Sequence, residues 1–93
     1  MHIRWTQDAL NDFKTISYRS EQDRNLDTAN RVCRSIYDAI QILRRHPYSG
    51  RLGTREGTRE LVISKSPYLV VYRVIETKVV QILRIWHGAQ QRF

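Results

Sequence analysis

Hydrophobic positions in the first half of the chain recur at spacings of three and four, which is the period of an α-helix. The clearest stripe comprises Ala29, Val32, Cys33, Ile36, Ile40 and Leu43. Thr6, a residue type favoured at N-caps, precedes a shorter stripe of Ala9, Leu10, Phe13 and Ile16. The polar stretch 18–25 predicts the end of the first helix and a turn, and Pro47 predicts the end of the second helix. Two antiparallel helices are therefore expected.

Other segments show the short apolar runs and the alternation that are typical of strands. Residues 2–5 predict a first strand, and residues 60–64 alternate after a loop over 46–57. Residues 68–75 are nearly all apolar or aromatic, as in a central strand, and a tight reversal at Glu76 and Thr77 leads to a last strand over 78–86. The order is β-α-α-β-β-β. The expected fold class is α+β, a helical hairpin packed on a small twisted antiparallel sheet, in a single domain over residues 1–93.

Strict alternation assigns the charged residues of the last strand to faces. Arg84 and Trp86 are expected on the face of Ile82, and His87 on the face of Leu83 and Ile85. An unpaired arginine is costly to bury among apolar residues, so it must reach the rim of the sheet, pair with a carboxylate such as that of Glu60 or Glu76, or face a binding groove.

Arginines gather near the last three strands. Arg51, Arg55 and Arg59 precede or begin the first of them, and Arg73 lies on the second, on the side of Leu69. For any one arginine, a salt bridge or a side chain that snorkels to the rim is the simpler interpretation. Several together favour a groove, for which the predicted residues are Arg59, Arg73, Arg84, Trp86 and His87.

The excess of basic over acidic residues indicates which kinds of partner the protein could bind. Lys and Arg total 16 against 9 Asp and Glu, a formal net charge of +7 on 93 residues. This charge favours nucleic acid, an anionic groove on another protein or an acidic binding segment as partner. The alternative interpretation is a basic surface that keeps the protein soluble and binds no such partner. Cys33 is the lone cysteine, which excludes an internal disulfide and suits a reducing cytoplasm. No apolar run reaches membrane-spanning length, so a cytoplasmic protein without a membrane partner is expected.

Catalytic chemistry is a weaker prediction. General acid–base cleavage of RNA needs a proton acceptor, a proton donor and cations for the phosphorane charge. His87 and Glu60 could transfer the protons, and Arg59 and Arg84 could stabilise the charge, but nothing in their spacing requires this. The three histidines are scattered without ligand spacing, so neither a metal nor another cofactor is expected.

Four segments, taken in order, resemble the RelE/ParE superfamily of bacterial toxin–antitoxin toxins. They are Leu-Arg-Arg-His-Pro-Tyr-Ser-Gly (43–50), Gly-Thr-Arg-Glu-Leu (57–61), Tyr-Leu-Val-Val-Tyr-Arg-Val (68–74) and Ile-Leu-Arg-Ile-Trp-His (82–87). The resemblance covers essentially the whole chain. It implies the RelE/ParE fold and the toxin role of a type II pair, with a cognate antitoxin as partner in a hetero-oligomer.

The resemblance also implies one of two targets. RelE-like members cleave messenger RNA on the ribosome, whereas ParE-like members poison DNA gyrase. Ribonuclease members carry an arginine where this chain has Leu69, and the residues after His87 lack their basic, tyrosine-bearing tail. The ParE-like reading, a gyrase inhibitor that is not an enzyme, is therefore favoured. The alternatives are a ribosome-dependent endoribonuclease that uses His87, Arg59, Arg84 and Glu60, and a toxin-derived binding module without toxicity.

Overall fold

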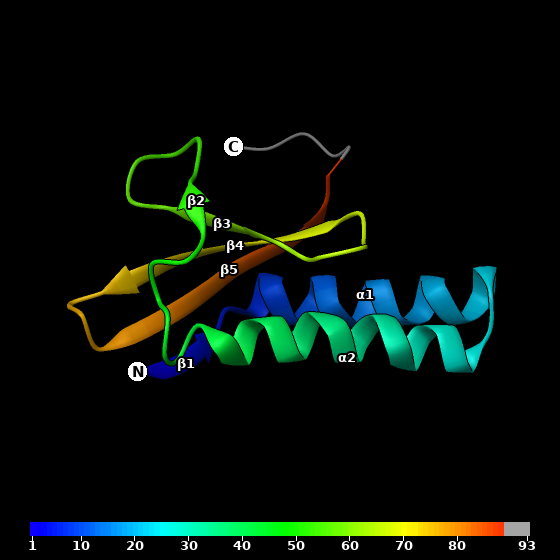
Figure 1. The fold of residues 1–93 in the computed structure, drawn as a ribbon. Coiled ribbons are helices and arrows are strands. Elements are labelled where there is room, and N and C mark those ends of the chain that lie inside the picture. Colours follow the sequence, from blue (N-terminus) through cyan, green and yellow to red (C-terminus); the bar gives the residue numbers. More distant parts are fainter. Residues whose placement is uncertain (89–93) are drawn as a thin grey trace.

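A helical hairpin and a five-stranded sheet form the two layers of the molecule (Figure 1). In this computed structural model, the structure describes residues 1–88. The elements in chain order are β1 (His2–Trp5), α1 (Gln7–Asp23), α2 (Leu26–Ile42), β2 (Arg51–Leu52), β3 (Arg59–Val62), β4 (Tyr68–Ile75) and β5 (Val79–His87). The predicted helical hairpin on a small sheet is confirmed. The segment 46–57, predicted as a loop, contains one short strand, β2, because it pairs with the start of β3.

Both helices begin at side-chain caps. The hydroxyl of Thr6 accepts a hydrogen bond from Ala9 N (3.1 Å), and the side chain of Asn25 accepts one from Thr28 N (2.8 Å). As predicted, α1 ends within the polar stretch 18–25, at Asp23. The polar residues before that point include good helix formers and are mostly exposed, so the helix continues through them until the chain turns and Asn25 caps α2.

The strand order in the sheet is β1-β5-β4-β3-β2. β1 is parallel to β5, with Ile3 opposite Val80 and Trp5 opposite Ile82, while all other neighbours are antiparallel. The sheet is therefore mixed, which corrects the prediction of a wholly antiparallel one. The whole helical hairpin separates β1 from the other strands, and a connection of that length permits a parallel pair.

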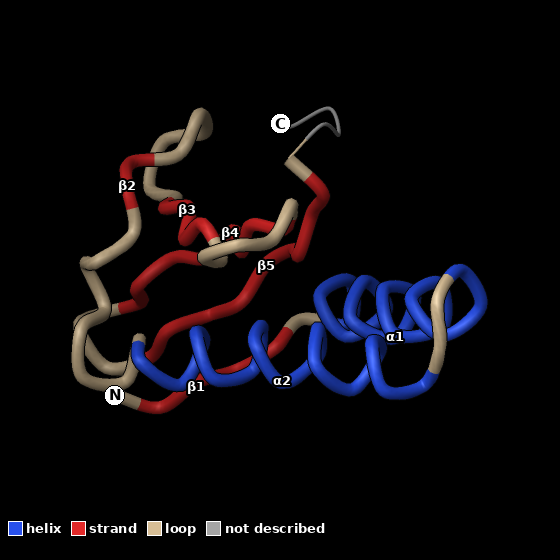
Figure 2. Tube along the Cα trace, turned by 45° about the vertical axis from the view of Figure 1, so that its right-hand side comes forward, coloured by secondary structure: helices blue, strands red, loops and turns tan. Residues whose placement is uncertain are grey.

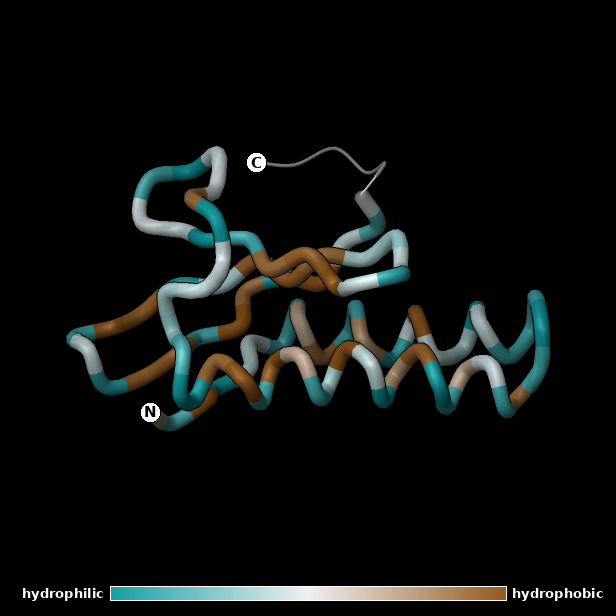
Figure 3. Tube along the Cα trace, in the orientation of Figure 1, coloured by the Kyte–Doolittle hydropathy of each residue, from teal (hydrophilic) through white to brown (hydrophobic). Residues whose placement is uncertain are grey.

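The main core lies between the helices and the sheet. Ile36 and Ile40 of α2 are fully buried in one cluster with Val70 and Tyr72 of β4. The remaining buried members of that cluster are Ala9, Ile16, Leu43, Ile63, Val80, Ile82 and Ile85. Figure 3 shows the corresponding hydrophobic positions recurring along α2 and following the central strands. The stripe predicted for the second helix is confirmed as its buried face.

A β-bulge in β5 changes which side chains share a face. Val71 is paired with Arg84 and Tyr72 with Ile82, so Leu83 is an extra residue on β5. Beyond it the alternation is reversed. Ile85 therefore joins the main core, while Trp86 packs with Leu69 and Val71 in a second cluster on the opposite face. The prediction that Trp86 shares a face with Ile82, and His87 with Leu83, is wrong for this reason.

Tyr72 and Arg59 fix the chain where it leaves the helices. The buried Tyr72 hydroxyl donates to Pro47 O (2.8 Å) and accepts from Gly50 N (2.9 Å). Arg59 donates to Gly50 O (2.8 Å), and its guanidinium lies 5.2 Å from the ring centroid of Tyr48. A Cβ at Gly50 would lie 2.7 Å from the Tyr72 hydroxyl oxygen, so this contact requires glycine. We name the contacts among Tyr72, Arg59 and Gly50 the tyrosine latch.

The segment between β2 and β3 extends away from the helices, on the opposite side of the sheet (Figures 1 and 2). Gly53 N donates to Thr58 O (2.8 Å), and Thr58 N donates to Arg55 O (3.1 Å), which closes this segment as a compact turn. No helix within residues 1–88 is long and apolar enough to cross a membrane.

Candidate functional site

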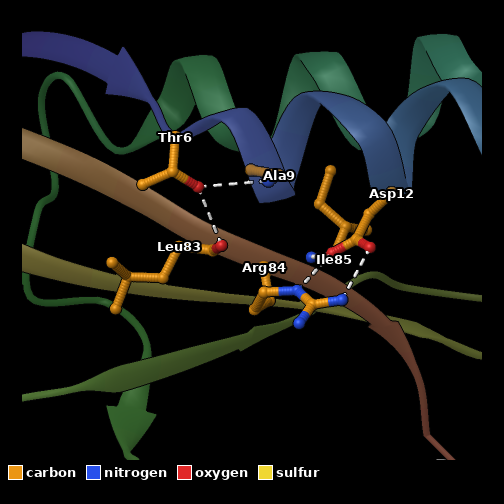
Figure 4. Close-up of polar contacts among 6 residues, drawn as sticks. All are labelled: Thr6, Ala9, Asp12, Leu83, Arg84 and Ile85. Atoms are coloured by element: carbon orange, nitrogen blue, oxygen red, sulfur yellow. Dashed lines mark hydrogen bonds and ion pairs between the residues drawn. The ribbon is translucent and has the colours of Figure 1, made fainter.

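The edge of β5 beyond β1 is closed by side chains from the start of α1 (Figure 4). Thr6 Oγ1 donates to Leu83 O (3.0 Å), and Asp12 Oδ2 accepts from Ile85 N (2.9 Å). These two bonds satisfy main-chain groups at the bulge that no neighbouring strand could reach, because β1 ends at Trp5. The N-terminal turns of α1 therefore take the place of a strand along this part of β5.

Arg84 forms a bidentate ion pair with the same carboxylate. Its Nε lies 2.8 Å from Asp12 Oδ2 and its Nη2 lies 2.9 Å from Oδ1. The hydrogen bond with Asp12 raises the pKa of the Arg84 guanidinium, so the residue stays charged and paired. Among the carboxylates considered in the sequence analysis, neither Glu60 nor Glu76 is the partner. The two residues of this pair are 72 positions apart, and no local pattern in the sequence joins them.

Trp86 is chiefly a packing residue of the sheet. Its side chain is 7% exposed and forms the second cluster with Leu69 and Val71. The Arg84 guanidinium carbon lies 5.1 Å from the centroid of the Trp86 ring, within cation–π range. Arg84 and Trp86 are therefore brought together as predicted, but the ring presents little of its surface to a ligand.

His87 lies at the open end of β5, where the sheet and the helical hairpin meet. Its ring packs edge-to-face on Tyr68, with 5.8 Å between centroids. Two adjoining hollows of about 280 Å³ and 440 Å³ share Arg19, Tyr68 and His87 in their linings. The first also reaches Asp12, and the second reaches Arg24 of the helix–helix turn. We name these two hollows together the His87 hollow; a cation, an imidazole and a phenol here could bind an acidic or aromatic side chain.

Arg59 and Arg73 lie on opposite faces of the sheet. Arg59 stands opposite Tyr72 on the helix-facing side, where it contacts main-chain carbonyls of the tyrosine latch. Arg73 follows Tyr72 and therefore faces the other side, where its Nε donates to Gln81 Oε1 (2.8 Å). The five residues predicted for one groove are thus distributed over three places: the latch, the outer face of β4, and the end of β5.

Glu60 and His87 do not form a proton-transfer pair in this arrangement. Glu60 is 5% exposed, accepts from Arg51 Nη2 (3.0 Å), and stands opposite Val71 on the helix-free face. His87 follows Trp86 and lies on the other face. At about 3.3 Å per residue and 4.8 Å per strand, the two backbone positions are roughly 14 Å apart.

Sequence reasoning missed Asp12, Arg19 and Tyr68, which together with His87 surround the end of β5. Their positions in the sequence give no signal, because α1 is brought against β5 only by the tertiary fold. Within residues 1–88, no three His, Cys, Asp or Glu side chains gather as a metal site would require.

Comparison with known proteins identifies the family. A family model described as "ParE toxin of type II toxin-antitoxin system, parDE" matches residues 3–92. Y4kP, a candidate toxin of Sinorhizobium fredii, is 40% identical over 89 residues, which are 96% of this chain and 90% of the relative. The chain belongs to the ParE toxin family, and is therefore a toxin of the type II toxin–antitoxin class.

Solved structures agree on the fold. The chromosomal ParDE system of P. aeruginosa contains a chain with a TM-score of 0.84 and 25% identity, and the match covers 94% of this chain and 95% of that one. A chain of the intact E. coli RelBE toxin–antitoxin complex has a TM-score of 0.71 and 16% identity, with 98% of both chains covered. The second likeness concerns the fold alone.

Proposed function

We propose that this toxin inhibits DNA gyrase by direct protein–protein contact and is neutralised by a cognate antitoxin in a hetero-oligomer. The observation that carries the proposal is the match of the ParE toxin family model to residues 3–92, nearly the whole chain. The structural neighbour from P. aeruginosa belongs to a ParDE toxin–antitoxin system, which supports an antitoxin as partner.

The geometry favours contact over RNA cleavage. Cleavage by general acid–base chemistry needs two proton-transfer groups that converge on one phosphodiester. Glu60 and His87 lie on opposite faces of the sheet, and Glu60 is already paired with Arg51. Leu69 stands where the resemblance to ribonuclease members expects an arginine, and it is buried in the second cluster. Because position 69 of β4 is a buried leucine, it supplies no cation that could bind a phosphate.

The surface is suited to an acidic and apolar antitoxin. The net charge is +7, and large hydrophobic side chains are exposed on both layers. Tyr18 and Leu26, near the tip of the helical hairpin, are 65% and 57% exposed, and Val62 on β3 is 54% exposed. A partner that covered these residues would bury apolar area and balance the charge at once.

A supercoiling assay with purified toxin and purified gyrase tests the proposal. We expect blocked supercoiling or trapped cleaved DNA, and restored supercoiling when the cognate antitoxin is added at equal concentration. A translation reaction with the same preparation is the control. Codon-positioned cleavage of messenger RNA that is lost in His87→Ala, together with normal supercoiling at high toxin excess, would overturn the gyrase proposal in favour of a ribonuclease.

A further inference from the structure

A cleft lies on the helix-free side of the sheet, remote from the His87 hollow. Its volume is about 560 Å³, and it separates the β2–β3 segment from β4 and from the bulge of β5. The lining residues are Arg55, Glu56, Gly57, Thr58, Arg73, Val74, Ile75 and Leu83. Figures 1 and 2 show the β2–β3 segment standing over this side of the sheet. We name it the Arg73 cleft.

Arg73 is oriented without being neutralised. Its Nε donates to the neutral side chain of Gln81 (2.8 Å), which fixes the plane of the guanidinium. Arg51 and Arg84 are paired with carboxylates instead. Within residues 1–88, no carboxylate pairs with Arg73, and its side chain is exposed. The edge of the guanidinium that carries the two terminal nitrogens is the edge that matches a carboxylate bidentately.

The rest of the lining indicates the size and polarity of a ligand. The charged residues of the lining are two arginines, Arg55 and Arg73, and one carboxylate, Glu56, and Arg73 is the arginine placed to bind one carboxylate of a ligand. Ile75 and Leu83 add an apolar wall on this face, which a polyphosphate chain would not use, while Val74 between Arg73 and Ile75 packs against the main core. Gly57 has φ +80°, and an added Cβ would meet nothing within 4 Å, so its backbone is open to an approaching chain.

We propose that the Arg73 cleft binds an acidic–aliphatic segment of a partner protein. The carboxylate of an Asp or Glu pairs with the terminal nitrogens of Arg73, and an adjacent aliphatic side chain packs on Ile75 and Leu83. The proposal is independent of which protein the toxin inhibits, because it rests on the charge and lining of this cleft alone.

The matched peptides N-acetyl-Leu-Asp-Leu-amide and N-acetyl-Leu-Asn-Leu-amide test this recognition. Titration into the ¹⁵N-labelled full chain, followed by NMR, gives a Kd from the shifts of the Arg73 Nε–H and Gly57 N–H signals. We expect saturable shifts at both positions with the Asp peptide, and binding at least about tenfold weaker with the Asn peptide, because a charge-assisted hydrogen-bond pair is lost.

Three variants distinguish specific binding in the Arg73 cleft from general electrostatic attraction to a basic protein. Arg73→Gln should weaken binding of the Asp peptide about tenfold, and Arg73→Lys should restore only part of it, because Lys cannot pair bidentately. Arg31→Gln, on the exposed side of α2, removes the same charge and should leave the Kd within about twofold. Each variant is checked for an unchanged thermal unfolding midpoint.

Several results would overturn the proposal. Equal weakening by Arg73→Gln and Arg31→Gln would mean that only net charge attracts the peptide. Equal affinity for the Asp and Asn peptides would exclude carboxylate recognition. Tighter binding of inorganic phosphate or of an oligothymidylate, with shifts at the same two signals, would assign the cleft to phosphate and reject an acidic protein segment.

Discussion

Arg84 and Arg73 lie on neighbouring strands of one sheet, yet their surroundings differ in the one respect that decides what an arginine can do. Arg84 has a carboxylate, Asp12, on both of its contacting nitrogens. Arg73 has only a neutral amide, Gln81, on one. The first arginine therefore stabilises the junction of α1 and β5, and the second keeps a charge available to a partner. Position on a strand does not distinguish these roles; the location of the nearest carboxylate does.

A charged substitution in the core should lower the free energy of unfolding more than any substitution that affects either arginine. Ile36→Asp places an unpaired carboxylate at a position with 0% exposure, in the middle of the main cluster. We expect a loss of about 4 kcal/mol or more in the free energy of unfolding, measured by urea denaturation. If the variant had the same urea midpoint of unfolding as the wild type, α2 would not bury this face.

Asp12→Ala should have the next largest effect. The substitution leaves Arg84 without its carboxylate and Ile85 N without an acceptor at the closed edge of β5. We expect a loss of about 2–4 kcal/mol, because a charged and a neutral donor both lose their partner. Asp8→Ala, on the same helix and exposed, is the matched control and should cost less than about 1 kcal/mol. Equal losses for the two variants would remove the special role of Asp12.

Tyr72→Phe tests the tyrosine latch, where a neutral group rather than a charge holds the chain. Loss of the bonds to Pro47 and Gly50 should cost about 1–2 kcal/mol near neutral pH.

The latch also has a pH signature. Burial raises the pKa of the Tyr72 hydroxyl above its ordinary value. This contribution to stability is complete below the unfolded tyrosine pKa of about 10 and is lost as the pH rises through the folded pKa, because the unfolded chain ionises first. Urea unfolding at pH 8 to 11 should therefore show a steeper decline for the wild type than for Tyr72→Phe. Parallel declines would rule out the buried hydroxyl as the titrating group.

Arg73→Gln should have the smallest effect on stability. The side chain is exposed and bonds only Gln81 among the described residues, so the free energy of unfolding should change by less than about 0.5 kcal/mol. The difference from Asp12→Ala would distinguish an arginine that stabilises the fold, Arg84, from one whose charge is available to a partner, Arg73. A loss above about 1 kcal/mol would place Arg73 among the structural arginines.

The sequence allowed the helical hairpin and the late strands to be predicted, because periodicity and Pro47 are local signals. The bulge at Leu83 was not predicted, since no glycine marks it in the run from Val79 to Trp86. That one extra residue reversed the faces assigned to Trp86 and His87. Likewise, the parallel pairing of β1 and the bonds of Asp12 depend on contacts more than 70 residues apart in the chain. Among the predicted groove residues, sequence identified the arginines but not their acceptors.

The most direct test of this account is a pair of double-mutant cycles on the free energy of unfolding. One uses Asp12→Ala and Arg84→Ala, and the other uses Gln81→Ala and Arg73→Ala. We expect a coupling of about 1–3 kcal/mol for the first pair and below about 0.5 kcal/mol for the second. Couplings of equal size would contradict this expectation, because Arg73 would then be as fully engaged within the fold as Arg84.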